Sequence, residues 1–265
     1  MFGRFRSLDE NSDMEVDFEG DVFDGIVYPA PEYQHLDDEY ALSSLLILSP
    51  VLPSKIICVG LNYSDHAREL NMPVPKNPIL FLKPPTALLP HNGCIVYPGA
   101  SKQVEYEAEL AVIIGKDGKN ISSEDSDSYI AGFSCFNDVT ARDLQKEDGQ
   151  WTRAKSFDTF APLGPFIVTP EELEQQNLNP ENLNIQTRIT DRDGNIRVCQ
   201  NSNTAELIFK IPKLIAFISN IMTLKKGDVI ATGTPPGVGQ LLPGETVDVE
   251  IEGIGILSNT VIEDF

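Results

Sequence analysis

The stretch VEYEAELAVIIG, residues 104–115, decides the fold class of this chain. Apolar and acidic residues alternate through its first half, and an unbroken apolar run follows, up to the turn-forming pair Asp117-Gly118. Alternation with a period of two residues indicates a β-strand, and a short apolar run bounded by a turn is consistent with a buried one. On such a strand Glu105, Glu107 and Glu109 would stand on one side. The sequence therefore predicts a strand that carries a row of carboxylates.

Strand signals recur on both sides of this stretch. Short apolar or alternating runs predict further strands, at 55–59, 78–83, 185–190, 196–198, 246–251 and near residue 261, with a hairpin turn at 193–194. Helical patterns are fewer and cover 63–70, 123–130 and 204–221. We expect Asn62 or Ser64 to cap the first helix, and Pro212 to interrupt the last as the first residue of a second helix.

The first fifty residues differ from the rest of the chain. They hold an acidic run between Asp9 and Asp21, with scattered apolar residues and short strand and turn signals. The segment SPVLP, residues 49–53, is typical of a linker, because each proline favours an extended conformation in the residue before it. We therefore predict a small β-rich N-terminal module over residues 1–53 and a larger domain over residues 54–265. The fold class is mixed and mainly β, since the few helices form no regular βαβ series.

Acidic residues outnumber basic ones, which narrows the range of partners. The 265 residues include 40 Asp and Glu against 20 Lys and Arg, for a formal net charge of −20. Nucleic-acid binding and docking on anionic lipid both depend on clustered positive charge, so neither partner is expected. The apolar runs are too short to span a bilayer, and the chain begins without the apolar stretch of a signal peptide. Four widely spaced cysteines form no CxxC pair and are typical of buried thiols in a reducing cytosol, which predicts a cytoplasmic location.

The row of glutamates has two interpretations, a solvated strand face or a group of carboxylates that lines a cleft. In a cleft, like charges raise each other's pKa unless a cation neutralises them, and carboxylate ligands favour Mg²⁺, Mn²⁺ or Ca²⁺ over zinc. Asp138 follows the apolar segment 132–136 and would complete a set of three carboxylates with Glu107 and Glu109. A lone Asp is more commonly a helix cap or a turn residue, so both readings of Asp138 stay open.

Two further segments contain residue types used in catalysis or binding. His66 and Glu69 are three residues apart, so on a helix they share a face, and the carboxylate would raise the basicity of the imidazole for proton transfer. A surface His–Glu pair explains the same spacing. The segment ATGTPPGVG, residues 231–239, would cradle an anion or form a rigid turn, and it lacks the GK[ST] of a nucleotide-binding P-loop.

Six segments together point to a known family. In order along the chain, they are GLNYSDHAREL (60–70), FLKPPTAL (81–88), VEYEAELAVIIG (104–115), FNDVTARDLQ (136–145), AKSFDTFAPLGP (154–165) and KGDVIATGTPPGVG (226–239). In this order and spacing they closely resemble the fumarylacetoacetate hydrolase family. The resemblance runs from about residue 55 to the C-terminus.

The resemblance implies a β-roll core, usually in a homodimer, and a bound divalent metal. The metal would be Mg²⁺ or Mn²⁺, with Ca²⁺ as an ion that can take its place in vitro. The resemblance places Glu107, Glu109 and Asp138 as the metal ligands. Glu105 lies outside that set, either at the surface or in support of the ligands.

The resemblance also implies the residues that act on the substrate. His66 and Glu69 fall where hydrolytic members carry a water-activating dyad, on a short lid helix. Lys155 would stabilise the charge that develops in the reaction. Gln145, Lys155 and Thr234 fall where family members contact the carboxylate and the keto or enol oxygens of the substrate.

The implied substrate is a small 2-oxo acid or its enol, chelated through carboxylate and 2-oxo oxygens. Hydrolysis of a C–C bond in an acylpyruvate is the first expectation. Oxaloacetate decarboxylation or tautomerisation and isomerisation of 2-hydroxyhepta-2,4-diene-1,7-dioate are the alternatives, and a non-catalytic small-acid-binding protein is a more remote one. The chain has Leu61 where some acylpyruvate-cleaving relatives have arginine, which removes a positive lid contact and leaves the substrate open.

Overall fold

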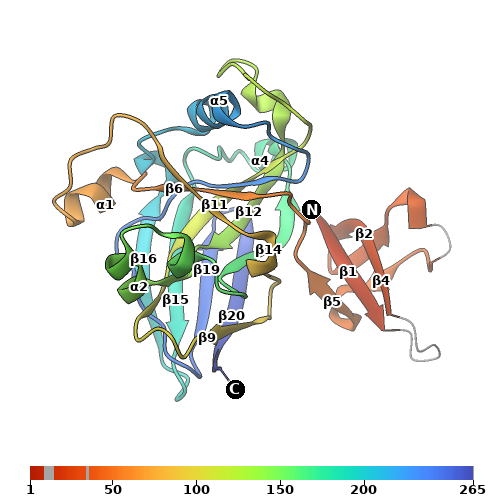
Figure 1. The fold of residues 1–265 in the computed structure, drawn as a ribbon. Helices are drawn as coiled ribbons and strands as arrows, with labels where there is room; N and C mark the ends of the chain where they lie inside the picture. Colours follow the sequence, from red (N-terminus) through yellow and green to blue (C-terminus); the bar gives the residue numbers. More distant parts are fainter. Residues whose placement is uncertain (9–14, 34–35, 265) are drawn as a thin grey trace.

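The computed structural model describes residues 1–8, 15–33 and 36–264. Strands dominate this part of the chain and form several sheets, as predicted (Figure 1). The strands near the N-terminus lie to one side of the body that contains β11, β15 and β19 (Figure 1). Among the described residues, no helix is both long enough and apolar enough to cross a membrane.

The largest sheet joins strands from distant parts of the sequence. Its order is β4 (Tyr40–Ala41), β3 (Ile26–Pro29), β2 (Glu15–Phe23), β1 (Phe2–Leu8), β14 (Ala161–Val168), β12 (Ile130–Asn137), β11 (Ala108–Ile114), β17 (Val229–Ala231), β6 (Ile56–Gly60) and β7 (Ile79–Lys83). In addition, β5 (Leu45–Leu48) pairs with β1, and β8 (Leu88–Leu89) pairs with β14. The pairs β17–β6 and β8–β14 are parallel, whereas β11 is antiparallel to both of its neighbours.

Two smaller sheets complete the body. The five-stranded sheet has the order β16 (Ile196–Asn203), β15 (Asn184–Thr190), β19 (Thr246–Ile251), β20 (Gly255–Glu263) and β9 (Cys94–Tyr97). The three-stranded sheet has the order β13 (Thr140–Ala141), β10 (Val104–Tyr106) and β18 (Gly239–Gln240). Strand β19 buries every second residue, which is the alternation that its sequence predicts. Its buried side chains join those of β11, β12 and β15 in the main core, so the two larger sheets pack face to face.

Five short α-helices lie around the sheets in the described part of the chain. They are α1 (Ser64–Glu69), α2 (Arg142–Asp148), α3 (Thr152–Lys155), α4 (Pro170–Gln175) and α5 (Ile211–Ile221). Single 3₁₀ turns occur at η1 (Pro31–Tyr33), η2 (Leu42–Ser44), η3 (Pro85–Ala87), η4 (Ser126–Tyr129) and η5 (Thr204–Glu206). A capping box begins α4, since the Thr169 hydroxyl accepts from Glu172 N and the Glu172 carboxylate accepts from Thr169 N. Pro212 lies in the first turn of α5, as the sequence predicts.

Three local predictions are wrong. The helix expected over 123–130 is reduced to η4, and the cysteines are not all buried, because Cys94 is exposed. Neither Asn62 nor Ser64 caps α1, which begins after Tyr63 without a side-chain cap. The Asn62 amide instead forms buried hydrogen bonds with backbone groups of Phe209 and Thr232, far along the chain.

The N-terminal strands have a small apolar cluster of their own. Phe5, Phe18, Val22 and Val27 are buried together, and Phe166 of β14 completes the cluster. Strand β1 meets β14 through the pair Phe2 and Ile167, so the N-terminal strands continue the large sheet. Residues 9–14 of the acidic run lie outside the described residues. The domain boundary at residue 53 stays a prediction.

Candidate active site

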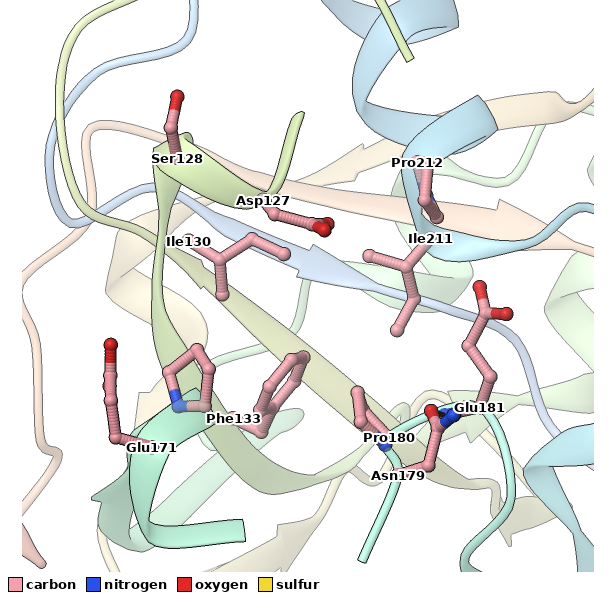
Figure 2. Close-up of a pocket in the computed structure, with 11 residues that line it drawn as sticks. Asp127, Ser128, Ile130, Phe133, Glu171, Asn179, Pro180, Glu181, Ile211 and Pro212 are labelled. Carbon is pink, nitrogen blue, oxygen red and sulfur yellow. Dashed lines mark hydrogen bonds between the residues drawn. The ribbon is translucent and has the colours of Figure 1, made fainter. Parts of the chain in front are cut away.

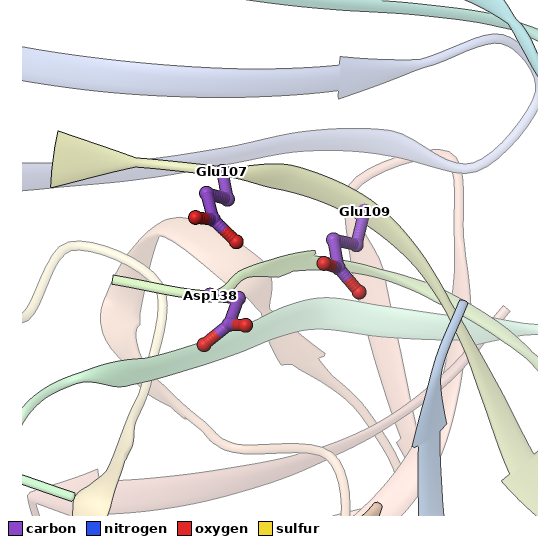
Figure 3. Close-up of side chains that lie close together, drawn as sticks. All are labelled: Glu107, Glu109 and Asp138. Atoms are coloured by element: carbon purple, nitrogen blue, oxygen red, sulfur yellow. The ribbon is translucent and has the colours of Figure 1, made fainter. Parts of the chain in front are cut away.

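Three buried carboxylates converge where β10, β11 and β12 meet. Glu107 lies between β10 and β11, Glu109 lies on β11, and Asp138 directly follows β12. Because β11 and β12 are paired, Asp138 N reaches Glu107 O at 2.9 Å. One carboxylate oxygen from each residue lies within 4.8 Å of the other two (Figure 3). The interpretation as a solvated strand face is therefore wrong, and Asp138 caps no helix, since α2 begins after Ala141.

Two buried lysines hold the carboxylates together. Lys155 Nζ donates to Glu107 Oε2 at 2.9 Å and to Asp138 Oδ2 at 2.6 Å. Lys83 Nζ donates to Asp138 Oδ1 and, at 2.9 Å, to Val139 O. A buried ammonium group must be paired, and each lysine satisfies this need with a carboxylate. Burial lowers the pKa of Lys155, but Asp138 and Glu107 outweigh it and raise the pKa above its usual value, so Lys155 stays charged.

Arg142, at the start of α2, links Glu105 to the cluster. Its Nε donates to Glu105 at 2.7 Å, and its two other nitrogens donate to Glu107 and, at 2.6 Å, to Gln145 Oε1. Glu105 is buried and accepts from Arg142, so it does not lie at the surface and is connected through Arg142 to the three carboxylates. Sequence reasoning assigned no role to Lys83 or Arg142. The available signal was their presence in the family-like segments 81–88 and 136–145.

Glu107 and Glu109 differ in how far nearby positive charges offset the effect of burial on their pKa values. Burial raises the pKa of Glu107, but the lysine and arginine paired with it outweigh this effect and hold its pKa at about 2. Burial also raises the pKa of Glu109, and the charges of Asp138 and Glu107 add to the rise. A 2.8 Å hydrogen bond from Gly233 N does not offset them, so the pKa of Glu109 lies well above its usual range. Glu109 is therefore the carboxylate that gains most from a nearby cation.

The donor set fits a hard divalent cation. Metal–oxygen bonds of Mg²⁺ measure about 2.1 Å, so opposite ligands lie about 4.2 Å apart. The carboxylate oxygens, within 4.8 Å of one another, need only small shifts to reach that spacing. An all-oxygen, buried set suits Mg²⁺ or Mn²⁺ better than zinc. Each carboxylate oxygen has more than one lone pair, so the ion pairs with lysine leave acceptor capacity for a metal.

His66 and Glu69 form a hydrogen-bonded pair on α1. The distance from His66 Nδ1 to Glu69 Oε2 is 2.8 Å, and Glu69 Oε1 accepts from Gly237 N at 3.2 Å. His66 is buried and the Glu69 side chain is 44% exposed, so the pair lies at the boundary between the buried site and solvent. With Nδ1 engaged by the carboxylate, Nε2 is the ring nitrogen that can exchange a proton with a ligand.

Asn62 fixes the start of α1 relative to the rest of the site. Its Nδ2 donates to Phe209 O at 3.1 Å and to Thr232 O at 2.7 Å, and its Oδ1 accepts from Phe209 N at 2.8 Å. Gly233, which follows Thr232 in the sequence, donates to Glu109. One short segment therefore supports both the carboxylates and the helix that carries His66.

A cavity of about 250 Å³ brings the predicted site residues together. It is lined by His66, Glu107, Glu109, Asp138, Gln145, Lys155 and Thr234, and Glu69 contacts His66 from outside the lining. The Gln145 Oε1 atom accepts from Arg142, which leaves the amide nitrogen for a ligand. The Thr234 hydroxyl donates to Ala108 O at 2.9 Å and accepts from Gln200 Nε2 at 2.8 Å, so it can only accept a further bond.

A larger cavity, of about 650 Å³, lies elsewhere, between η4, α4 and the start of α5 (Figure 2). Asp127, Glu171 and Glu181 line it together with apolar side chains such as Phe133 and Ile211. None of the predicted site residues lines this cavity. The volume of a cavity therefore does not identify the candidate active site. The carboxylates and His66, which line the smaller cavity, are the better guide to it.

Comparison with known proteins agrees with this geometry. A family model described as "Fumarylacetoacetate (FAA) hydrolase C-terminal" matches residues 55–262. The chain belongs to the fumarylacetoacetate hydrolase family. This confirms the resemblance inferred from the six sequence segments.

Individual members of the fumarylacetoacetate hydrolase family match over most of the chain. A mitochondrial oxaloacetate tautomerase, Fahd2a of Rattus norvegicus, is 44% identical over 229 residues, which cover 83% of this chain and 70% of that protein. Among solved structures, 5-carboxymethyl-2-hydroxymuconate delta-isomerase from Mycobacterium smegmatis matches with a TM-score of 0.84 and 39% identity, over 100% of this chain and 99% of the other. Maleylpyruvate hydrolase from Sphingobium sp. SYK-6, in complex with manganese(II) and pyruvate, matches with a TM-score of 0.80 and 27% identity, over 99% and 100%. These likenesses confirm the mainly β fold.

Proposed function

We propose that this protein is a divalent-metal-dependent enzyme that hydrolyses a C–C bond in an acylpyruvate-type 2-oxo acid. One observation carries the proposal. Glu107, Glu109 and Asp138 line the same small cavity as His66, and Glu69 holds the His66 ring from outside that lining. A set of carboxylates alone would serve metal binding, whereas the added imidazole supplies a base for water.

We propose Glu107, Glu109 and Asp138 as the ligands of Mg²⁺ or Mn²⁺. The acidic, all-oxygen donor set supports this choice, as does the manganese and pyruvate complex of the related maleylpyruvate hydrolase. When bound, such an ion supplies Lewis-acid chemistry that polarises the 2-oxo oxygen and offsets negative charge that develops in the reaction.

His66 is the proposed base. Glu69 holds Nδ1, so Nε2 accepts a proton from water, and the resulting hydroxide adds to the C4 carbonyl carbon of the acylpyruvate. Cleavage of the C3–C4 bond releases the acyl group as a carboxylic acid and leaves the bonding electron pair on C3. Protonation of C3 then gives pyruvate, so one water is consumed and two acids are formed.

Three further side chains are proposed to position the substrate. Lys155 keeps its positive charge beside Glu107 and Asp138, so it stabilises the oxyanion that forms at C4. The Gln145 amide nitrogen can donate to a substrate oxygen. Thr234 accepts a bond from an enol hydroxyl or a water, because its own proton is held by Ala108 O.

The metal requirement can be tested by removing ligands. Glu107→Ala and Asp138→Ala should each abolish Mn²⁺-dependent cleavage of acetylpyruvate and the rise in thermal stability on Mn²⁺ addition. Glu171→Ala, which removes a carboxylate from the larger cavity, is the matched control and should behave like the native protein. Full activity of the native protein in chelator-treated buffer would contradict the proposal.

Oxaloacetate tautomerisation or decarboxylation and isomerisation of a muconate-type dienoate are the second candidates. The 44% identity to an oxaloacetate tautomerase and the likeness to a hydroxymuconate isomerase support them. These reactions need no attack by hydroxide, so His66→Ala should remove hydrolysis yet spare them. A panel of acetylpyruvate, oxaloacetate and a 2-hydroxymuconate analogue separates the three reactions. Binding without turnover of any of them would instead support a non-catalytic small-acid-binding protein.

We also propose a homodimer in the cytoplasm. Strand β16 is an outer strand of its sheet, and its Ile196 and Val198 are exposed. An apolar sheet edge is a surface that a second copy would cover. A molar mass near 29 kDa in light scattering, the mass of one chain, would contradict the dimer.

A further inference from the structure

The cavity at the candidate active site has two chemically different sides. The carboxylates, Lys155 and Arg142 form the charged part of its lining. Apolar side chains from the segments before and after α1, from β7 and from the residue before α3 line much of the remainder, among them Leu61, Leu70, Met72, Ile79 and Trp151. Three of these are unusually open to solvent for their type, since Leu70, Met72 and Ile79 are 48%, 50% and 44% exposed.

Trp151 forms a fixed wall on the apolar side. Its ring meets the Phe81 ring edge-on, with 5.1 Å between the centroids. It also lies directly over Gly60, where an added Cβ would come within 2.9 Å of the indole ring. The close approach of the indole to the strand end at Gly60 therefore requires glycine there, and it holds the ring against the cavity.

The Lys155 ammonium lies 5.0 Å from the centroid of the Phe81 ring, but its hydrogen bonds go to the carboxylates. Among the described residues that line it, Arg142 and Lys155 are the permanently charged basic groups, and both already pair with carboxylates. A ligand that chelates at the carboxylate cluster would extend its other end towards Leu70, Met72 and Ile79. A second carboxylate placed there would find no unpaired permanent cation among the described lining residues, so no ion pair would replace any water that it lost.

We propose that the apolar side binds the tail of the substrate, and that this enzyme selects 2-oxo acids that end in an uncharged alkyl or aryl group over those that end in a second carboxylate. The proposal rests on the proposed function for the orientation of the 2-oxo acid. It names the substrate class more narrowly, as monoanionic acylpyruvates. The partly exposed apolar side chains are then explained as a surface completed by the ligand.

Binding of simple 2-oxo acids tests the tail preference apart from hydrolysis. Calorimetric titrations with Mn²⁺ present would compare pyruvate, 2-oxobutanoate, 2-oxopentanoate and 2-oxohexanoate, each one methylene longer than the last. Burial of a methylene is worth up to about fourfold in affinity, so Kd should fall about two- to fourfold at each step. The matched diacid 2-oxoadipate, which has a carboxylate in place of the methyl group of 2-oxohexanoate, should bind about tenfold more weakly or worse.

A charge introduced into the wall should change this order. Ile79→Lys places a cation on β7 beside the cavity, at a side chain exposed enough to accept it, and should narrow or reverse the preference for 2-oxohexanoate over 2-oxoadipate. Leu82→Lys is the matched control, because Leu82 lies on the same strand at 46% exposure but does not line the cavity. The control should keep the native preference.

The outcomes separate this proposal from the proposed function. Equal or tighter binding of 2-oxoadipate by the native protein, or a flat alkyl series, would overturn the tail proposal even if acylpyruvates are hydrolysed. If Kd falls along the alkyl series as expected but no acylpyruvate is hydrolysed, the tail proposal is supported and the proposed hydrolase activity is rejected. Failure of every 2-oxo acid to bind with Mn²⁺ would overturn both.

Discussion

Replacement of Lys83 by methionine tests how the buried carboxylates are held in the absence of metal. The Lys83 and Asp138 side chains are 0% and 1% exposed, so the pair is removed from water. Methionine is unbranched and of similar length, so it fills the same space without the charge. The variant leaves Asp138 with Lys155 as its cationic partner, 2.6 Å from Oδ2.

The expected loss follows from this arrangement. Removal of one member of a buried ion pair costs about 3–5 kcal/mol, because the other charge is left without its partner. Since Asp138 keeps Lys155, we expect the lower end, about 3 kcal/mol. In a protein of this size each 1 kcal/mol lowers Tm by about 2–4 °C, so Tm should fall by about 6–12 °C in chelator-treated buffer.

Urea and thermal unfolding followed by circular dichroism would measure the loss. Lys225→Met is the control, because Lys225 and Asp117 form an ion pair whose side chains are 53% and 56% exposed, and water screens such a pair so that it contributes little to stability. Asp138→Asn added to Lys83→Met should recover part of the loss, since no carboxylate is then stranded. The reasoning would be refuted if Lys83→Met lost no more stability than the control Lys225→Met. It would also be refuted if the stability losses of Lys83→Met and Asp138→Asn simply added in the double variant.

Three further predictions concern other parts of the structure. Asn62→Ala should lower the free energy of unfolding by about 2–4 kcal/mol, because it strands buried backbone groups of Phe209 and Thr232; urea midpoints measure this, and a change below 0.5 kcal/mol would be inconsistent with it. Gly60→Ala should displace Trp151 and weaken 2-oxohexanoate binding about fourfold, the value of one methylene, while pyruvate binding stays unchanged. Added salt should raise kcat/KM for the anionic substrate at low ionic strength, because it screens the net charge of −20, and a steady fall from the lowest salt upwards would contradict this.

Local patterns predicted much of the fold, and contacts between distant residues account for the rest. The alternation in 246–251 and the apolar spacing in 204–221 are properties of neighbouring residues. Strand β19 forms as expected, whereas the helix expected over 204–221 forms only over 211–221, with the 3₁₀ turn η5 at its start. The pairing of β6 with β17 joins segments more than 170 residues apart, and no local pattern encodes it. The set of Glu107, Glu109 and Asp138 could be proposed because the two glutamates alternate along one strand, Asp138 follows another apolar segment, and the family-like segments contain all three.

The site contacts that the sequence did not predict are formed between residues that only the completed fold brings together. Lys83 has the sequence context of a strand end, and only the fold shows that it reaches Asp138, 55 residues away. Asn62 is of a residue type that favours helix caps, and it lies just before α1. Its side chain nevertheless forms its hydrogen bonds with Phe209 and Thr232. A side chain that can form several alternative hydrogen bonds takes the partners that the completed fold places beside it.

The chemistry and the tail preference rest on different pieces of chain. Segment 232–233 bonds both Asn62, at the base of α1, and Glu109, so it aligns the two halves of the reaction centre. The proposed tail wall comes mainly from 70–79, whose backbone closes the end of α1 through the bonds from Leu70 N to His66 O and from Met72 N to Ala67 O. Side-chain substitutions there leave these backbone bonds in place, so under the tail proposal they would change which acid is accepted more than they change the alignment. For directed evolution, a library confined to those positions would explore new substrates while most of its members remain competent catalysts.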